Sequence, residues 1–421
     1  MRVIVVWQGG GALGAYAAGV WRELVPRLQA RGARLVGVAG ASIGAINAAV
    51  IARHHADADW GVAALQAFWR ERLATPSWPF TGALAWLPPW SELARSWDGL
   101  LTGLLIGNRG LYQALPLNWN PLAGLQRLHR PLLDRSRMLA TLQQTVGALQ
   151  SEPGAPWLGV AASDLLSGEL HVFGTDQGEI TPQHLAASAA IPLFFEPVEI
   201  DGRRLWDGDM IRRSMLPAVI QRVAAREAPS TPADPLVCIS IELMPREAAH
   251  APLSGAAIMA RVAQLQQAGK LHADEAPAPL PAGWRALHLA RGPLPNDGVS
   301  NQFDYSPHRI EQLIAQGSQE ARQAWAQWTG EHVEAPSAEP PAARSARRRL
   351  AVEAGPGAGD AEAPSAASAA SSTSASPAEP SAADPVAEAV REVLGTGQPS
   401  QPLTPPQISG AADGMVGGTV H

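Results

Sequence analysis

The chain has a single cysteine, Cys238, and no long uncharged apolar run. One cysteine excludes an internal disulfide and cannot by itself form a cysteine zinc site. Its place in the apolar run LVCISIEL predicts a buried and unreactive thiol. Because no stretch of about 18 uncharged apolar residues occurs, we expect no transmembrane helix.

The net charge does not indicate a nucleic-acid partner, and the N-terminus does not indicate an exported protein. The net charge is −6 over 421 residues, which is too small to indicate nucleic-acid binding. The apolar run after Arg2 covers about five residues, shorter than the apolar core of a secretory signal, and it enters a glycine turn without a cleavage-type pattern. We therefore expect no nucleic-acid partner, a buried first strand and a cytoplasmic location.

Composition divides the chain near residue 330. Residues 1–329 are rich in alanine, leucine and valine, which is enough for a sizeable core. Residues 330–421 are mostly alanine, proline, serine, glycine and glutamate, with few large apolar side chains. Such a segment cannot bury enough apolar surface to offset the entropy lost on ordering. We predict one folded domain over 1–329, followed by a disordered, low-complexity tail over 330–421.

Apolar patterning predicts alternating strands and helices. Residues 3–7 and 35–39 are typical of buried strands, and each is followed by a glycine-containing loop and a helical pattern, over 15–29 and 45–53. Residues 306–328 predict a long closing helix. Further strands are expected at residues 157–162, 169–173, 198–200, 235–242 and 286–289. The predicted fold class is α/β, a three-layer α/β/α sandwich with a mainly parallel central sheet.

A glycine-rich loop, GGGALG at residues 9–14, follows the first strand and opens the first helix. It fits the dinucleotide fingerprint G-x-G-x-x-G. The acidic residue that usually holds the ribose is missing, since none lies between Glu23 and Asp57, although Arg31 and Arg34 would suit a phosphorylated ribose. The same geometry exposes backbone N–H groups that can stabilise an oxyanion. This loop leaves both an NADP-dependent reductase and an oxyanion-binding enzyme open.

The second strand ends in GASIG, residues 40–44, which fits G-x-S-x-G between a strand and a helix. Such a sharp turn exposes the hydroxyl of Ser42 and requires small neighbours, so we predict that Ser42 is a nucleophile. The helix that follows contributes the positive end of its dipole, and the N–H of Ile43 becomes an oxyanion donor. An ordinary α/β-hydrolase places this turn after several strands. Here it follows the second, and a histidine partner, if used, would best be His308.

A third motif lies far along the chain, at Asp207 and Gly208 in the run WDGD, preceded by ASAAIPLFFEPVEIDG. The glycine loop, G-x-S-x-G and this D-G motif, in this order, resemble the patatin-like phospholipase family over residues 3–329. The resemblance implies a dyad in which Ser42 is the nucleophile and Asp207 its base. The oxyanion hole would be formed by the backbone amides of Gly10, Gly11 and Ile43. The remaining motif glycines are Gly9, Gly14, Gly40, Gly44 and Gly208.

The resemblance implies a lipid acyl hydrolase, a serine carboxylic-ester hydrolase of the phospholipase A, lysophospholipase or carboxylesterase type. Asp207 would accept the proton of Ser42 during attack on the ester, and water would then release the acyl group from the acyl-enzyme. The substrate would be a lipid ester, and neither a cofactor nor a metal would be needed. Two other functions stay open: an NADP-dependent reductase that uses the glycine loop, and a catalytically inactive lipid-binding member of the family.

Two positions depart from the family pattern. Leu13 stands where the family commonly has arginine or lysine, which puts in doubt a contact to an anionic head group. Asp209 stands at the third position of D-G-[GA], where the family has glycine or alanine. A second carboxylate there either raises the pKa of Asp207 or forms a surface salt bridge to Arg212 or Arg213. Of these two outcomes, the surface pairing is our expectation.

Residues 70–122 differ from the rest because they are rich in tryptophan, proline and leucine, weakly periodic and without strand signals. Tryptophan favours the boundary between water and acyl chains, and prolines interrupt a simple core helix. We predict a substrate-entry cap that touches lipid surfaces, which would make the protein peripheral to a membrane. The alternative is that these rings pack as core beneath a long insertion. The tryptophans concerned are Trp78, Trp86, Trp90, Trp97 and Trp119.

Overall fold

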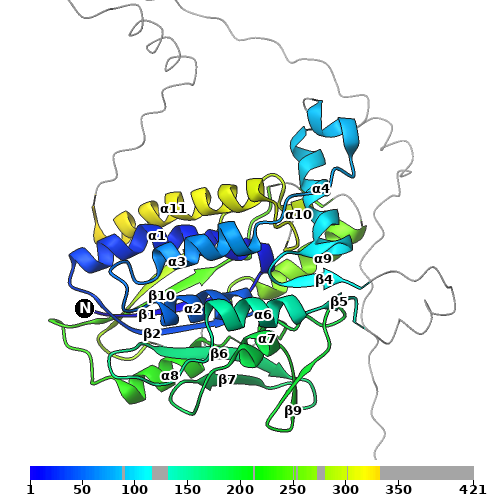
Figure 1. Ribbon diagram of the computed structural model, residues 1–421. Helices are drawn as coiled ribbons and strands as arrows, with labels where there is room; N and C mark the ends of the chain where they lie inside the picture. The colour runs from blue at the N-terminus through cyan, green and yellow to red at the C-terminus, as the bar shows by residue number, and fades with distance from the viewer. Residues whose placement is uncertain are drawn as a thin grey trace, which may run out of the picture. The chain divides into compact units, whose positions relative to one another are not determined.

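The computed structural model describes residues 1–87, 91–115, 131–211, 214–249, 251–252, 255–272, 280–300 and 302–331. Within them the chain forms a central eight-stranded sheet (Figure 1). Its strands are β1 (Arg2–Trp7), β2 (Arg34–Ala41), β6 (Trp157–Asp164), β7 (Leu170–Gly174), β8 (Val198–Ile200), β9 (Arg203–Asp207), β10 (Leu236–Glu242) and β11 (Trp284–Ala290). Their order across the sheet is β11, β10, β1, β2, β6, β9 and β8, and β7 also pairs with β6.

Most of the sheet is parallel, as predicted from the sequence. Strands β11, β10, β1, β2 and β6 are parallel, whereas β7, β8 and β9 run antiparallel to their neighbours. All residues of β1, β6 and β10 are buried, as expected when helices cover both faces. They include Cys238, whose thiol pKa is raised by burial to about 12. The β8–β9 hairpin turns at Asp201 and Gly202, with φ angles of 50° and 74°, which match the strand twist.

Helices pack on both faces of the sheet and form the predicted three-layer sandwich (Figure 1). The apolar residues of β1 alternate between two cores, odd-numbered ones in the first and even-numbered ones in the second, because side chains alternate along a strand. The second core includes α8 (Leu216–Arg226). The first includes α1 (Gly14–Ala30), α2 (Ile43–Arg53), α3 (Val62–Ala67), α6 (Ser136–Thr145), α7 (Pro182–Ser188) and α11 (Pro307–Thr329).

Helix α11 packs along α1 through a glycine on each helix. A side chain at Gly19 would collide with the carbonyl of Ile314, and one at Gly317 would collide with the carbonyl of Tyr16. Small residues at these points therefore allow the two backbones to approach closely. Gly330 caps α11 with a φ of 74°, which glycine adopts without a steric penalty. The long closing helix predicted for residues 306–328 is confirmed.

The segment 70–122 has more regular structure than its sequence indicated. It contains the short 3-10 helix η3 (Gly82–Trp86), the helix α4 (Ser91–Leu105) and two strands of a three-stranded antiparallel sheet, formed by β3 (Gly107–Asn108), β4 (Tyr112–Ala114) and β5 (Leu133–Asp134). Strands β3 and β4 left no strand signal in the sequence because two or three residues are too few to show an alternating pattern. Residues 88–90 and 116–122 of the predicted cap, and 332–421 of the predicted tail, lie outside the described residues.

In the described part of the chain, no helix is both long enough and apolar enough to cross a membrane.

Candidate active site

Ser42 lies in a sharp turn between β2 and α2. Its backbone has φ 55° and ψ −131°, a conformation that residues other than glycine rarely adopt and that costs on the order of 1–3 kcal/mol. Close approaches require the flanking glycines. A side chain at Gly40 would collide with the backbone of Gly44, and one at Gly44 would place its Cβ 2.5 Å from the carbonyl oxygen of Trp7. The strand–turn–helix geometry expected of G-x-S-x-G is thus present at Ser42.

Strand β9 brings Asp207 to Ser42. Ala41, the last residue of β2, pairs with Ala161 of β6, and Asp207 pairs with the next residue, Ala162. Strand β7 pairs with one edge of β6. Strands β2 and β9 therefore pair one after the other with the opposite edge of β6, and β9 begins to pair where β2 ends. The hydroxyl of Ser42 lies beside the carboxyl group of Asp207 and lowers its pKa. The sheet therefore joins two side chains that are far apart in the sequence.

The carboxyl group of Asp207 is buried and surrounded by groups that act on its charge. Burial is the largest influence and raises its pKa from the ordinary 3.8 to about 7. Hydrogen bonds from the Ser42 hydroxyl and from the N–H of Asp209, the latter 2.8 Å from Oδ1, oppose this rise. The negative charge of Asp209 adds to it, and the positive charge of Lys270 opposes it. A carboxylate that titrates near neutral pH is a stronger base than an exposed one.

Ser188, the last residue of α7, anchors the turn at Ser42. Its side chain is fully buried, its Oγ accepts the backbone N–H of Ser42 at 2.9 Å, and its hydroxyl donates to the carbonyl of Ala161 at 2.6 Å. The motifs did not single out this residue. The available signal was a serine inside the apolar helical run LAASAA, because a buried hydroxyl requires hydrogen-bond partners.

The glycine loop passes directly beside Ser42. A side chain at Gly9 would place its Cβ 2.7 Å from the Cβ of Ser42 and 2.9 Å from the Cβ of Asp209. A dinucleotide bound to this loop would bring its pyrophosphate into the space that the side chains of Ser42 and Asp209 already occupy. The geometry therefore favours an ester-cleaving role for the loop over NADP binding.

The three amides expected to form the oxyanion hole belong to this loop and to the turn. Gly11 has a φ of 55°, which glycine adopts readily. The neighbouring N–H of Ala12 donates to the carbonyl of Gln302 at 2.8 Å. Within the described part of the chain, the N–H groups of Gly10, Gly11 and Ile43 donate to no backbone carbonyl outside their own helices.

The other motif positions contribute to packing. A side chain at Gly14 would place its Cβ 2.8 Å from Trp69 and 2.9 Å from Ile43, where α1 and α2 meet, and one at Gly208 would collide with the backbone of β6. Leu13, which replaces a basic residue of the family pattern, is 4% exposed and belongs to the core. Its side chain cannot reach a substrate head group.

The expected surface salt bridge of Asp209 is wrong. Asp209 is 7% exposed, and its Oδ1 lies 3.3 Å from the Nζ of Lys270. Arg212 and Arg213 lie outside the described residues. Proximity in sequence favoured the arginines, whereas the tertiary structure supplies Lys270 from the segment that follows α9 (Gly255–Gln267). The other outcome, in which Asp209 raises the pKa of Asp207, is the one that the structure favours.

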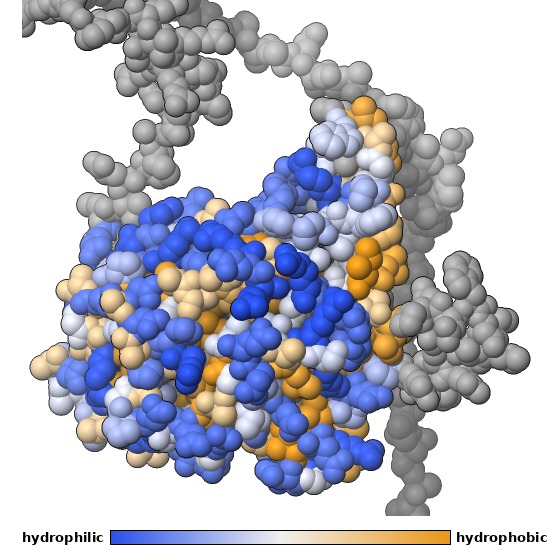
Figure 2. Space-filling model, in the orientation of Figure 1, coloured by the Kyte–Doolittle hydropathy of each residue, from blue (hydrophilic) through white to orange (hydrophobic). Residues whose placement is uncertain are grey.

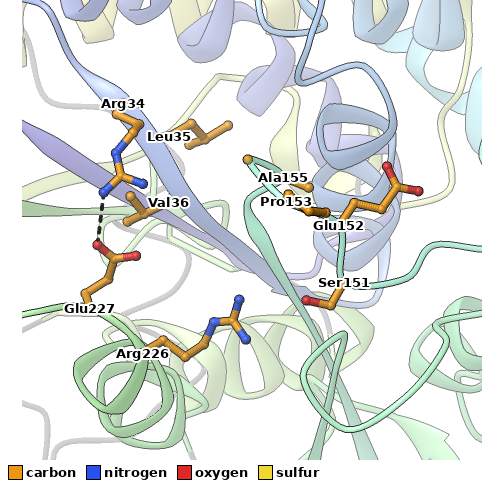
Figure 3. Close-up of a pocket in the computed structure, with 10 residues that line it drawn as sticks. Arg34, Leu35, Val36, Ser151, Glu152, Pro153, Ala155, Arg226 and Glu227 are labelled. Carbon is orange, nitrogen blue, oxygen red and sulfur yellow. Dashed lines mark hydrogen bonds and ion pairs between the residues drawn. The ribbon is translucent and has the colours of Figure 1, made fainter.

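Two further features do not belong to this site. His308 is exposed in the first turn of α11, and the structure describes no contact between it and Ser42. A cavity of about 430 Å³ is lined by residues that include Arg34, Ser151 and Arg226 (Figure 3). Because β2 begins at Arg34 and ends beside Ser42, this cavity lies at the opposite end of the sheet. In the described ranges, no group of three or more His, Cys, Asp or Glu residues could hold a metal ion.

The chain is similar to known proteins in sequence and in structure. A family model for patatin-like phospholipase matches residues 5–218. Solved structures that match include VipD from Legionella pneumophila, with 16% identity over 77% of this chain and 66% of that one and a TM-score of 0.33. The type III effector protein ExoU of Pseudomonas aeruginosa matches with 16% identity over 77% and 52% and a TM-score of 0.29. Human GIVD cytosolic phospholipase A2 matches with 14% identity over 77% and 59% and a TM-score of 0.28.

The chain spans about half to two thirds of the length of these three proteins. No curated protein matches it at a comparable level. The family model covers about half of the chain, residues 5–218 of 421.

Proposed function

This chain belongs to the patatin-like phospholipase family, and we propose that it hydrolyses carboxylic esters of lipids through a dyad of Ser42 and Asp207. The observation that carries the proposal is the placement of the strained Ser42 beside the buried carboxyl group of Asp207, whose pKa its hydroxyl lowers. It forms at the end of β2, where the glycine loop adjoins Ser42 at Gly9.

In the first half of the reaction, Asp207 accepts the hydroxyl proton of Ser42 while Oγ attacks the ester carbonyl. The carbonyl oxygen becomes an oxyanion and accepts hydrogen bonds from the N–H groups of Gly10, Gly11 and Ile43. The bond between the acyl carbon and the alcohol oxygen then breaks, and the protonated Asp207 returns its proton to the departing alcohol. The acyl group remains as an ester on Ser42.

In the second half, water replaces the alcohol. Asp207 takes a proton from the water molecule as its oxygen adds to the acyl carbonyl. The tetrahedral intermediate collapses, the Oγ of Ser42 leaves with the proton from Asp207, and the fatty acid is released. A carboxyl group whose pKa is about 7 can act as base and as acid at neutral pH, because both of its forms are populated.

The dyad is tested by covalent labelling and by turnover of lipid esters, with intact-mass detection of the acyl-enzyme. A fluorophosphonate probe should label the wild type and Ser167→Ala, whose serine lies exposed after β6, but not Ser42→Ala. Asp207→Asn should abolish turnover, whereas Asp201→Asn, in the exposed β8–β9 turn, should not. Labelling that persists in Ser42→Ala, or normal turnover by Asp207→Asn, would reject the dyad. If the wild type binds lipid but is not labelled, the result would favour an inactive family member. Binding of NADPH would favour a reductase.

We also infer that the chain meets its substrate at a lipid surface, through residues 78–106. Trp78 is 61% exposed and Trp86 is 85% exposed. No charged residue occurs from 73 to 91. Figure 2 shows apolar residues along one edge of the part that carries α4. The other exposed apolar residues of this segment are Phe80, Leu84, Leu87, Leu93, Trp97, Leu105 and Ile106.

The exposed side chains are carried by a well-anchored backbone. Asp98 of α4 accepts the N–H and the hydroxyl of Thr81 at 2.8 and 3.0 Å, and Thr102 accepts the N–H of Trp78 at 2.8 Å. The polar contacts therefore lie inside and the apolar side chains lie outside, which is the arrangement that tryptophan-rich interfacial segments require. The alternative of core packing is wrong for Trp78 and Trp86, while Trp90 lies outside the described residues.

A further inference from the structure

Lysine occurs once among the 32 lysine and arginine residues of the chain, at position 270. The side chain of Lys270 is 5% exposed. Its Nζ donates to the carbonyl oxygen of Asp209 at 2.5 Å and to that of Ile211 at 2.8 Å, and it lies 3.3 Å from the Oδ1 of Asp209. An ammonium group has three N–H donors, and three acceptors surround it here. The planar guanidinium of an arginine could not donate to all three of these acceptors in the same compact space.

The lysine is joined to the proposed base through Asp209. The N–H of Asp209 donates to the Oδ1 of Asp207 at 2.8 Å, while the carboxylate of Asp209 faces Lys270. Burial raises the pKa of Asp209, and the charge of Lys270 opposes that rise. One negative and one positive charge are thus buried together, next to the carboxyl group that the mechanism requires.

The position of Lys270 is itself fixed from the ends of two central strands. Glu242, the fully buried last residue of β10, accepts the N–H of Gly269 at 3.2 Å and the N–H of Leu271 at 2.6 Å. These are the amides on either side of Lys270. Gln8, which follows β1 and precedes the glycine loop, donates to the carbonyl of Gln267 at 2.7 Å. The lysine is therefore held from the ends of β10 and β1, and the glycine loop beside Ser42 follows β1.

We propose that Asp209 and Lys270 are positioning residues that act as a neutral pair on Asp207, and that Glu242 holds the lysine in place. This inference builds on the proposed function, because it assigns Asp207 as the base. A buried carboxylate without its lysine would oppose ionisation of Asp207, and a buried ammonium without its carboxylate would stabilise the ionised form and weaken the base. The pair avoids both outcomes while the backbone of Asp209 orients the Asp207 carboxylate.

The pH dependence of kcat/KM on a soluble ester separates this role from simple structural support. The charge of Asp209 raises the pKa of Asp207, and the charge of Lys270 lowers it. Asp209→Asn leaves the positive charge, so the midpoint of the acid limb should fall, and Lys270→Met leaves the negative charge, so it should rise, each by about one pH unit. The double variant should return close to the wild-type midpoint. Lys270→Arg should not restore the profile.

A second measurement does not depend on turnover. Because lysine occurs once, selective ¹⁵N-lysine labelling gives one side-chain NMR signal, which should respond to Asp209→Asn. The carboxyl titration of Asp207 can be followed by ¹³C NMR and assigned with Asp207→Asn. Its midpoint should fall in Asp209→Asn and rise in Lys270→Met. If Lys270→Met fails to fold, Asp209→Asn and the double variant still carry the comparison.

The outcomes distinguish this inference from the proposed function. An active wild type whose midpoint is the same in all variants, or single variants that shift it in one direction, would overturn the role of the pair. An unresponsive Lys270 signal would do the same. A wild type that hydrolyses no ester, yet shows the opposite carboxyl shifts, would reject the proposed function and support the pair.

Discussion

Replacing Asp207 by asparagine should remove a loss of stability that the wild type undergoes as the pH rises, while it also removes the base. Burial raises the pKa of Asp207 from 3.8 to about 7, whereas in the unfolded chain the group titrates near its ordinary value. Since the folded pKa is the higher one, the stability contributed by the protonated group is fully present below about pH 4 and is lost as the pH rises through about 7. At about 1.4 kcal/mol for each pKa unit, the loss is on the order of 4 kcal/mol.

Urea unfolding at a series of pH values from about 4 to 8 measures this loss of unfolding free energy directly. Asparagine does not titrate, so the free energy of unfolding of Asp207→Asn, minus that of the wild type, should grow by roughly 4 kcal/mol over this range. Any constant cost of the substitution cancels in this difference. Asp201→Asn, in an exposed turn, should instead run parallel to the wild type. Parallel curves for Asp207→Asn would refute the argument that burial raises this pKa.

Three further substitutions or truncations follow from the structure. Ser188→Ala leaves the N–H of the strained nucleophile without its acceptor and should lower the free energy of unfolding by about 1–3 kcal/mol; an unchanged value would show that another group replaces it. Trp78→Ala combined with Trp86→Ala should slow hydrolysis of vesicle lipids by about tenfold and spare a soluble ester. The matched control is Leu166→Ala, 83% exposed in the turn after β6, and equal losses on both substrates would argue against membrane contact. Truncation after Glu331 should change the melting temperature by less than about 2 °C, and a larger fall would mean that the tail packs on the domain.

The local part of the site could be predicted from the sequence. The turn at Ser42 depends on Gly40 and Gly44 and on the strand and helix that they connect, all within one short segment. The apolar runs of the central strands were equally visible, because strands buried on both faces have few polar residues. The D-G motif at Asp207 was recognised through its resemblance to a family, since a single aspartate at the end of a strand has no local signature of its own.

Contacts between distant segments could not be predicted in this way. The acceptor that Ser188 offers to Ser42, and the lysine that Asp209 meets, depend on which strands lie side by side. The tryptophans near residue 80 had a composition compatible with either core or surface, and whether another element covers them is a matter of packing. The strands β3 and β4 were missed because two or three residues are too few to show a period.

By itself, the sequence determined the alternation of strands and helices, the parallel core of the sheet and the turn that presents Ser42, since each depends on residues that are neighbours along the chain. Only the tertiary structure decided the charge around Asp207. The pKa of a buried carboxyl group depends on solvent exclusion and on the charges within a few ångströms, and here those charges come from Asp209 and from Lys270, which the sequence separates and the fold brings together.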